Sequence, residues 1–301
     1  ELAGEIYEAK KDYYAALDFY KKALKFNRFD DDILLNISYC YSMIKDYKLA
    51  DKYADMAIII NDKSAYSYYR KGNVMLAVER YDAAAEVFKK CIELEPEDLD
   101  YYHSISYCYS KTGQLELSFE YANRAIFLDK NSAYSYFRKA WALQEMEKYN
   151  ESISCYEKCI ECDSTFVDAY ANISFCYSKL KDFKKSILYA NKAIMVNKDY
   201  AYSHYRKAWA LHNMGKFDEA IDDYIEAIEL DPTDIYNYLG ITGVFLDKKE
   251  NFSALEFANK AIMLDRNCGN AYYYKSVALS NLGKKAEAEK IYAKARQLGF
   301  E

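Results

Sequence analysis

One twelve-residue stretch recurs along this chain at a fixed interval and constrains its fold more than any other feature. SAYSYFRKAWAL begins at Ser132, and its copies begin at Ser64 (SAYSYYRKGNVM) and Tyr200 (YAYSHYRKAWAL), 68 residues away on either side. A second stretch, SISYCYSK at Ser104, has copies 68 residues away at Asn36 and Asn172. Two kinds of 34-residue unit therefore alternate, here called the Tyr-Arg repeat and the Ser-Cys repeat.

The 34-residue period continues along the whole sequence without an insertion. It divides the chain into repeats at 1–30 (partial), 31–64, 65–98, 99–132, 133–166, 167–200, 201–234, 235–268 and 269–301. Stacked repeats share one continuous core, so we expect a single domain over 1–301. The sequence does not begin with methionine and its first repeat is incomplete, so we expect it to be a fragment of a larger protein.

Small side chains occupy fixed positions in every repeat, numbered 1 to 34. Positions 20 and 27 are always Ala, Ser or Cys, which lets two helices approach closely. Apolar residues spaced three and four apart predict helices, and the scarcity of glycine and proline favours long helices with short joins. Position 24 is aromatic in the Tyr-Arg repeats but Ala in the Ser-Cys repeats, where position 23 is aromatic instead. We therefore expect an all-α fold in which the two kinds of repeat pack differently.

These positions resemble the signature of the tetratricopeptide repeat. The match is clearest in 201–234, through Ala208, Leu211, Ala220, Tyr224, Ala227 and Pro232. The resemblance implies an α-solenoid of tandem helix-turn-helix repeats wound into a right-handed superhelix. It also implies that positions 2, 5, 6, 9, 12 and 13 of the first helices line a concave groove.

Aromatic rings and arginines dominate these groove positions, where a solvated helix would carry Lys, Glu and Gln. Such residue types are enriched at binding hot spots. The candidate ligand-binding residues are Asn36, Tyr66, Tyr69, Arg70, Asn73, His103, Tyr107, Tyr134, Phe137, Arg138, Trp141, Asn172, Phe175, Tyr202, Tyr205, Arg206 and Trp209. We expect their rings and guanidinium groups to face water until a ligand covers them.

Each residue type in this set suggests a separate contact with a bound peptide. The amides of Asn36 and Asn172 would hold the peptide backbone. The three arginines would bind carbonyl or carboxylate oxygens, and the rings would take apolar side chains. In the opposing interpretation, the rings pack as core and the arginines form ion pairs with Asp32, Asp100 and Asp168 on neighbouring repeats.

The last repeats differ from the others at the groove positions. Gly240 and Gly243 lie inside a predicted first helix, and Tyr274 replaces the arginine of the last Tyr-Arg repeat. Glycine in a helix costs about 1 kcal/mol relative to alanine. We interpret the glycines as marks of a weak, drifting repeat rather than of a deepened groove, and expect the main site in repeats two to seven.

The pattern predicts a protein-interaction scaffold that binds a peptide or protein segment, not an enzyme. One alternative is a carbohydrate or polysaccharide binder, because rings with Arg and Asn also suit sugars; another is the repeat region of a larger enzyme or regulator. The family subgroup that clamps chaperone carboxylate tails is matched only by Asn36 with Arg70 and Asn172 with Arg206. Its lysines are absent, which argues against such a clamp.

Composition excludes further classes of function. The net charge is −6 with both signs mixed, which argues against a nucleic-acid binder, and no apolar run reaches membrane-spanning length. Cys155, Cys159 and Cys162 share one predicted helix at apolar positions, so we interpret them as packing residues rather than as metal ligands. We expect no metal or other cofactor, a cytoplasmic location because of the many thiols, and possible self-association.

Overall fold

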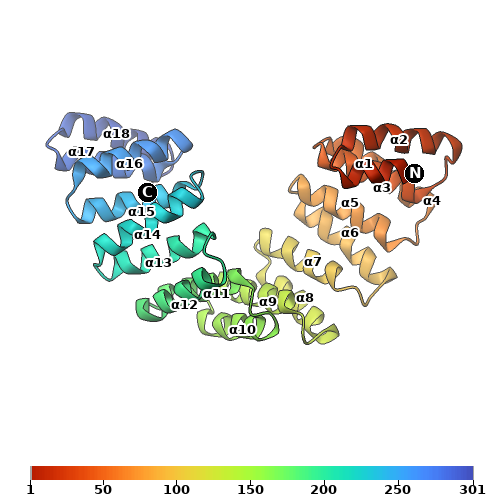
Figure 1. Cartoon of the computed structure of the whole chain (residues 1–301), viewed down its shortest axis with the longest axis horizontal. Helices are drawn as coiled ribbons and strands as arrows, with labels where there is room; N and C mark the ends of the chain where they lie inside the picture. Colours follow the sequence, from red (N-terminus) through yellow and green to blue (C-terminus); the bar gives the residue numbers. More distant parts are fainter. Residues whose placement is uncertain (1, 301) are drawn as a thin grey trace. The chain divides into compact units, whose positions relative to one another are not determined.

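The computed structural model describes residues 2–300, and all their regular structure is α-helical (Figure 1). The chain divides into two compact units, one ending at Lys148 and the other beginning at Tyr149. The predicted all-α class and the tandem helix-turn-helix repeats are confirmed in both units.

Nine helices are described in the first unit. They are α1 (Leu2–Ala9), α2 (Tyr13–Phe26), α3 (Asp31–Met43), α4 (Tyr47–Ile60), α5 (Ala65–Ala77), α6 (Tyr81–Leu94), α7 (Leu99–Lys111), α8 (Leu115–Leu128) and α9 (Ala133–Glu145).

Nine more are described in the second unit. They are α10 (Tyr149–Cys162), α11 (Val167–Lys179), α12 (Phe183–Val196), α13 (Ala201–Asn213), α14 (Phe217–Leu230), α15 (Ile235–Asp247), α16 (Asn251–Leu264), α17 (Gly269–Asn281) and α18 (Lys285–Gln297). Odd-numbered helices are the first helices of the repeats and even-numbered helices are the second.

Local signals in the sequence fix where these helices begin and end. Ser64 and Ser132 cap the first helices of two Tyr-Arg repeats, each accepting a hydrogen bond from a backbone N–H three residues further on. Position 15 of each repeat, in the turn between the two helices, has a positive φ of 59–79°. Glycine fills this position at Gly113, Gly215 and Gly283, while Lys or Glu adopts the left-handed conformation in the other repeats.

The small residues at positions 20 and 27 lie in the core, as the sequence predicts. Ala50, Ala84, Ala220 and Ala227 are fully buried. Where position 20 is serine, its hydroxyl is used inside the hairpin: Ser106 Oγ lies 3.1 Å from Ser118 Oγ. These contacts allow the two helices of a repeat to approach closely without leaving buried polar groups unpaired.

The two kinds of repeat pack differently, which confirms the prediction from positions 23 and 24. In the Ser-Cys repeats the aromatic ring at position 23 meets the ring at position 11 of the same repeat. Four pairs have ring centroids 5.5–5.8 Å apart: Tyr41–Tyr53, Tyr109–Tyr121, Tyr177–Tyr189 and Phe245–Phe257. In four Tyr-Arg repeats the ring at position 24 is instead fully buried (Tyr20, Phe88, Tyr156 and Tyr224), whereas Tyr292 in the last repeat is 43% exposed.

Phe88 and Tyr224 require glycine on the helix that they touch. A Cβ atom added at Gly72 would lie 2.4 Å from Cε1 of Phe88, and one added at Gly240 would lie 2.4 Å from Cε1 of Tyr224. Gly240 is therefore a packing requirement, and the interpretation of it as a mark of a drifting repeat is wrong. Gly243 differs, because its added Cβ would meet only Cε1 of His212, at 3.4 Å.

We predict opposite effects for alanine at the two glycines of α15. Gly240→Ala forces Tyr224 to move and should lower the free energy of unfolding by about 1–3 kcal/mol, the usual cost of overpacking. Gly243→Ala has room for its methyl group and should raise that free energy by up to about 1 kcal/mol through helix propensity. Urea unfolding of both variants measures the two free energies of unfolding. A change of the same sign in both variants would contradict the packing described for Gly240 and Gly243.

Candidate functional site

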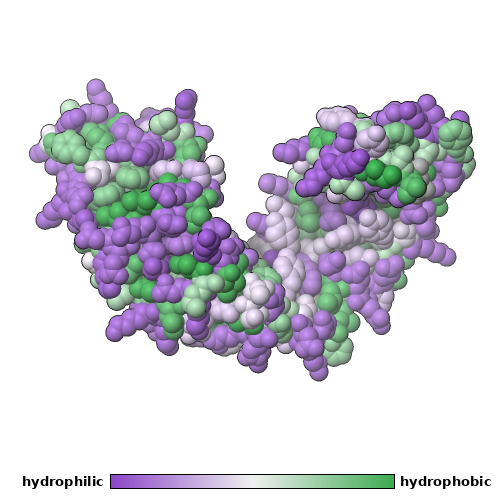
Figure 2. Space-filling view, viewed as in Figure 1, coloured by the Kyte–Doolittle hydropathy of each residue, from purple (hydrophilic) through white to green (hydrophobic). Residues whose placement is uncertain are grey.

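The candidate site in each unit is the face formed by its first helices. In the first unit this face carries a cavity of about 320 Å³ between α5, α7 and α9. In the second unit it carries one of about 330 Å³ between α13, α15 and α17. Figure 2 shows a pale area over α7, where the surface is less hydrophilic than the surface around it. A groove-like hollow thus exists at the predicted positions of each unit.

The candidate residues fall into three groups by exposure. Tyr66 and Tyr134 are exposed, at 50% and 42% of their surface. Four are buried: His103, Arg138, Asn172 and Arg206. The remaining candidates are half-buried: Asn36, Tyr69, Arg70, Asn73, Tyr107, Phe137, Trp141, Phe175, Tyr202, Tyr205 and Trp209.

The guanidinium group of Arg206 is enclosed by aromatic rings rather than open to water. Its Cζ lies 4.9 Å from the ring centre of Phe175 on the preceding first helix and 5.5 Å from that of Trp209. Its Nη2 donates to Ser178 Oγ at 2.9 Å. Arg206 is only 5% exposed, so the expectation that its guanidinium group faces water is wrong.

The same arrangement recurs 68 residues earlier. Arg138 is buried, its Cζ lies 5.3 Å from the ring centre of Tyr107, and its Nη2 donates to Ser110 Oγ at 2.9 Å. The expectation that Arg138 faces water is therefore also wrong. Arg70 lies 4.4 Å from the ring centre of Tyr39 but is only half-buried. Each arginine thus stacks on the position-9 ring of the preceding repeat, where cation–π attraction holds it.

The opposing expectation, an ion pair with an aspartate of the preceding repeat, does not hold for Arg206. Within residues 2–300 no carboxylate lies at ion-pair distance from Arg206, and its buried Nε has no hydrogen-bond partner. The corresponding aspartate, Asp168, instead accepts a hydrogen bond from the hydroxyl of Tyr200 at 2.5 Å. Aromatic rings and a serine hydroxyl therefore stabilise this cation.

Asn172 is directed into its own helix. Its side chain is buried, and Nδ2 donates to the backbone oxygen of Asp168 at 2.9 Å. This geometry does not match the expectation that the amide grips a ligand backbone. The incomplete match to the carboxylate clamp weakens further, since Asn172 and Arg206 are both buried.

His103 and three tyrosines meet at the cavity of the first unit, as the groove positions predict. The cavity is lined by Tyr69, Leu76, Asp100, His103, Ser104, Tyr107 and Tyr134. The ring of His103 packs edge-on against Tyr134, and Nε2 lies 2.7 Å from Ser135 Oγ. Burial, assisted by the nearby Arg138 charge, lowers the pKa of His103 to about 4, so the imidazole is neutral at pH 7.

The cavity of the second unit contains residues that were not in the candidate set. Its lining is Tyr205, Trp209, His212, Asn213, Tyr224, Tyr236, Leu239, Gly240, Gly243, Asn270 and Tyr274. Only Tyr205 and Trp209 were candidates, although every lining residue except Tyr224 stands at one of the six groove positions. The expectation that confined the main site to repeats two to seven left out this hollow.

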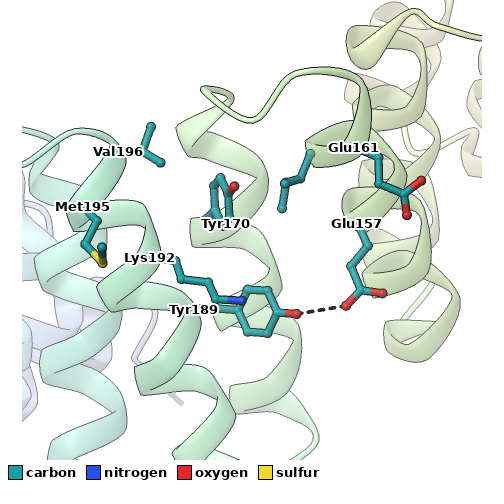
Figure 3. Close-up of a pocket in the computed structure, with 8 residues that line it drawn as sticks. Glu157, Glu161, Tyr170, Tyr189, Lys192, Met195 and Val196 are labelled. Atoms are coloured by element: carbon teal, nitrogen blue, oxygen red, sulfur yellow. Dashed lines mark hydrogen bonds between the residues drawn. The ribbon is translucent and has the colours of Figure 1, made fainter.

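A third cavity, of about 530 Å³, lies on the second helices of the second unit (Figure 3). It is lined by Glu157, Ile160, Glu161, Tyr170, Tyr189, Lys192, Met195 and Val196. The hydroxyl of Tyr189 on α12 donates to Glu157 on α10 at 2.9 Å. This cavity contains both signs of charge and only two aromatic rings, so it differs in chemistry from the first-helix cavities.

Tandem helix pairs with small residues at the crossings define a helical-repeat protein. Profiles of the tetratricopeptide repeat match residues 1–30, 65–98, 99–132, 133–166, 155–187 and 201–234, together more than half of the chain. The chain belongs to the tetratricopeptide repeat family, whose members generally mediate protein–protein interactions. No helix within residues 2–300 combines the length and apolar composition that a membrane span requires.

Several curated proteins are similar in sequence. A TPR repeat-containing protein of Methanocaldococcus jannaschii is 26% identical, over 73% of this chain and 40% of its own length. The BBSome complex member BBS4 of Bos taurus is 23% identical over 94% of this chain and 48% of its own. The Hsp70-Hsp90 organizing protein 3 of Arabidopsis thaliana is 25% identical over 76% of this chain and 42% of its own length. The chain thus spans less than half the length of these relatives.

Solved structures support the fold alone. The Cut9–Hcn1 complex of the APC/C aligns with a TM-score of 0.65, at 12% identity, over 94% of this chain and 56% of that one. YrrB, described as a TPR protein with an unusual peptide-binding site, aligns with a TM-score of 0.50 at 24% identity. The alignment covers 65% of this chain and 97% of that one.

Proposed function

We propose that the first-helix face of each unit binds a segment of a partner protein. The observation that carries the proposal is the row of exposed and half-buried aromatic rings beside a cavity in each unit. Tyr66 and Tyr134 expose about half of their surface at groove positions, where a solvated helix would carry charged residues. Rings that combine an apolar body with a hydrogen-bonding tip favour contact with protein segments.

The buried arginines support this proposal in a different way from the sequence-based hypothesis. Arg206 lies within 6 Å of the ring centres of Phe175, Tyr202, Tyr205 and Trp209, and so restricts their rotamers. A partner that binds rings already held in place loses less conformational entropy on association. In this proposal the rings contact the partner, and the arginines position the rings.

The proposed role is that of a non-enzymatic scaffold. The partner is a protein segment whose apolar and aromatic side chains enter the first-helix cavities. Eight cysteines without a disulfide among the described residues fit a reducing compartment, and we propose a cytoplasmic location on that ground.

Selection from a displayed library of random dodecapeptides tests the proposal. Enriched peptides are expected to bind the intact chain and to lose affinity in the double variant Tyr66→Ala/Tyr134→Ala. Loss of two hot-spot rings costs about 2 kcal/mol or more, roughly a 30-fold rise in Kd. Both residues expose about half of their surface, so the melting temperature should change little.

Phe127→Ala provides the matched control in the same unit. Phe127 is 82% exposed on the second helix α8, away from the first-helix face, and its removal should leave the Kd unchanged. Peptides that lose affinity equally in Phe127→Ala would contradict the proposal. Saturable binding of glycans with no peptide enriched would point instead to a carbohydrate binder.

A further inference from the structure

The first-helix cavity of the second unit is lined in part by two glycines, Gly240 and Gly243. α15 belongs to a Ser-Cys repeat. The other Ser-Cys repeats carry Asn36, Ser104 or Asn172 at position 6 and an aromatic ring at position 9, whereas α15 carries Gly240 and Gly243 there. The ring of Tyr224 packs beneath Gly240, whereas a Cβ added at Gly243 would meet only His212. The missing ring at position 9 therefore contributes to the cavity of about 330 Å³ between α13 and α17. Apolar cavities of about 150 Å³ already accommodate a benzene ring, so this one has room for a larger aromatic group.

Aromatic rings form part of the walls. Tyr205 and Trp209 on α13, Tyr236 on α15 and Tyr274 on α17 all line the cavity. Tyr236 is 62% exposed, so its ring is free to move onto a ligand. A flat aromatic ligand would gain stacked or edge-on contacts with these rings beyond the area that it buries.

The wall of the cavity also contains a polar group without a partner. Tyr224 is fully buried, and its hydroxyl has no hydrogen-bond partner within residues 2–300. The ring passes beneath Gly240, where an added Cβ would lie only 2.7 Å from the hydroxyl oxygen. The equivalent ring in the first repeat, Tyr20, donates its hydroxyl to Glu8 at 2.9 Å. Leaving a buried hydroxyl unpaired is costly, so a ligand group that bonds to it gains affinity.

The lining selects for a neutral ligand. It contains no Lys, Arg, Asp or Glu, and its one imidazole, His212, is held by Asp247 at 2.7 Å. The buried cation Arg206 lies 5.5 Å from the ring centre of Trp209, on a wall of the same cavity. A basic side chain would be desolvated here without a carboxylate in the lining, and the charge of Arg206 would oppose it.

We infer that this cavity binds a tyrosine or tryptophan side chain of the partner segment. The ligand ring lies against Trp209, Tyr236 and Tyr274, and its O–H or N–H group forms a hydrogen bond with the hydroxyl of Tyr224. This inference rests on the proposed function, because a bound segment delivers the side chain. It adds to that proposal the type of residue that the segment must carry.

Small probes test the cavity independently of any partner. The chain has two tryptophans, so the Trp141→Phe variant leaves Trp209, in the cavity wall, as the sole fluorescent tryptophan. N-acetyl-tyrosinamide should change its emission with a Kd on the order of 1 mM. N-acetyl-phenylalaninamide, which lacks the hydroxyl, should bind about 3- to 10-fold more weakly, the value of one hydrogen bond.

Three further substitutions in the Trp141→Phe background identify the site. Tyr224→Phe should abolish the preference for the tyrosine probe, and Gly243→Leu, which fills the cavity, should weaken both probes at least 10-fold. Phe252→Ala removes an exposed ring on the second helix α16 and should change neither Kd. Circular dichroism establishes that each variant is folded.

Several outcomes would overturn the inference. They are an absence of probe binding, equal binding of N-acetyl-leucinamide, tighter binding of N-acetyl-argininamide, or a tyrosine preference that persists in Tyr224→Phe. If selected peptides still depend on Tyr66 and Tyr134 while the probes fail, the inference is wrong and the proposed function stands. If the probes bind with the predicted preference and no library peptide binds, the cavity takes aromatic groups but the proposed function is wrong.

Discussion

Replacing Tyr224 by alanine is expected to lower the free energy of unfolding of the second unit by about 3–5 kcal/mol. The ring is fully buried and touches the helix backbone at Gly240, so truncation leaves a large cavity. Tyr224→Phe should behave differently. Its hydroxyl has no partner among the described residues, so removing it should leave the stability unchanged or raise it by up to about 1 kcal/mol.

Tyr20→Phe is the matched comparison for the hydroxyl. This variant loses the 2.9 Å hydrogen bond to Glu8 and should be destabilised by about 1–2 kcal/mol. Urea unfolding followed by circular dichroism measures all three variants. Equal losses for Tyr224→Phe and Tyr20→Phe would show that the Tyr224 hydroxyl is satisfied in solution.

Acidification from pH 7 to pH 4 is expected to destabilise the first unit through His103. Burial lowers the folded-state pKa of this imidazole to about 4, whereas the unfolded chain takes up the proton near pH 6.5. The unfolded state therefore binds more protons as the pH falls through this window. The loss of stability begins near pH 6.5 and reaches about 3 kcal/mol near pH 4.

His103→Gln should remove most of this pH dependence. Glutamine keeps a hydrogen-bonding group near Ser135 but does not titrate. His204 acts in the opposite direction: its hydrogen bond with Asp223 raises its pKa, so its contribution is complete at low pH and is lost as the pH rises. An NMR titration of the three histidines checks the assignment directly. A His103 that titrates near pH 6.5 in the folded protein would contradict it.

The architecture could be predicted because it depends on residue size at fixed intervals. Alanine, serine or cysteine at position 20 and an aromatic residue at position 23 or 24 determine how two helices meet. The sequence therefore indicated both the hairpins and the two packing modes. Pairs such as Tyr41 with Tyr53 follow directly from that spacing.

The environment of the arginines could not be predicted from their own positions. Position 6 is a groove position in the family pattern, but the burial of Arg206 depends on a ring at position 9 and a serine at position 12 of the preceding repeat. Phe175 and Ser178 supply these contacts. Both residues belong to the Ser-Cys stretch, which recurs with the same 68-residue period as the arginines. That shared period is the signal that the position-by-position prediction missed.

Gly240 illustrates the same limit. Its reduced helix propensity is visible in the sequence, whereas its contact with Tyr224 of the preceding repeat depends on how successive hairpins stack. Propensity alone therefore indicated a weak repeat at a place where the structure requires glycine.

Site-specific photo-cross-linking tests the central claim, that the first-helix face is the docking surface, most directly. Benzoylphenylalanine is introduced in place of Tyr134 on α9 or in place of Phe127 on α8, both exposed side chains of the first unit. A library-selected peptide is then irradiated with each protein, and the products are mapped by mass spectrometry. The account predicts cross-links from position 134 and none from position 127. Cross-links from position 127 alone would place the partner on the second helices and contradict it.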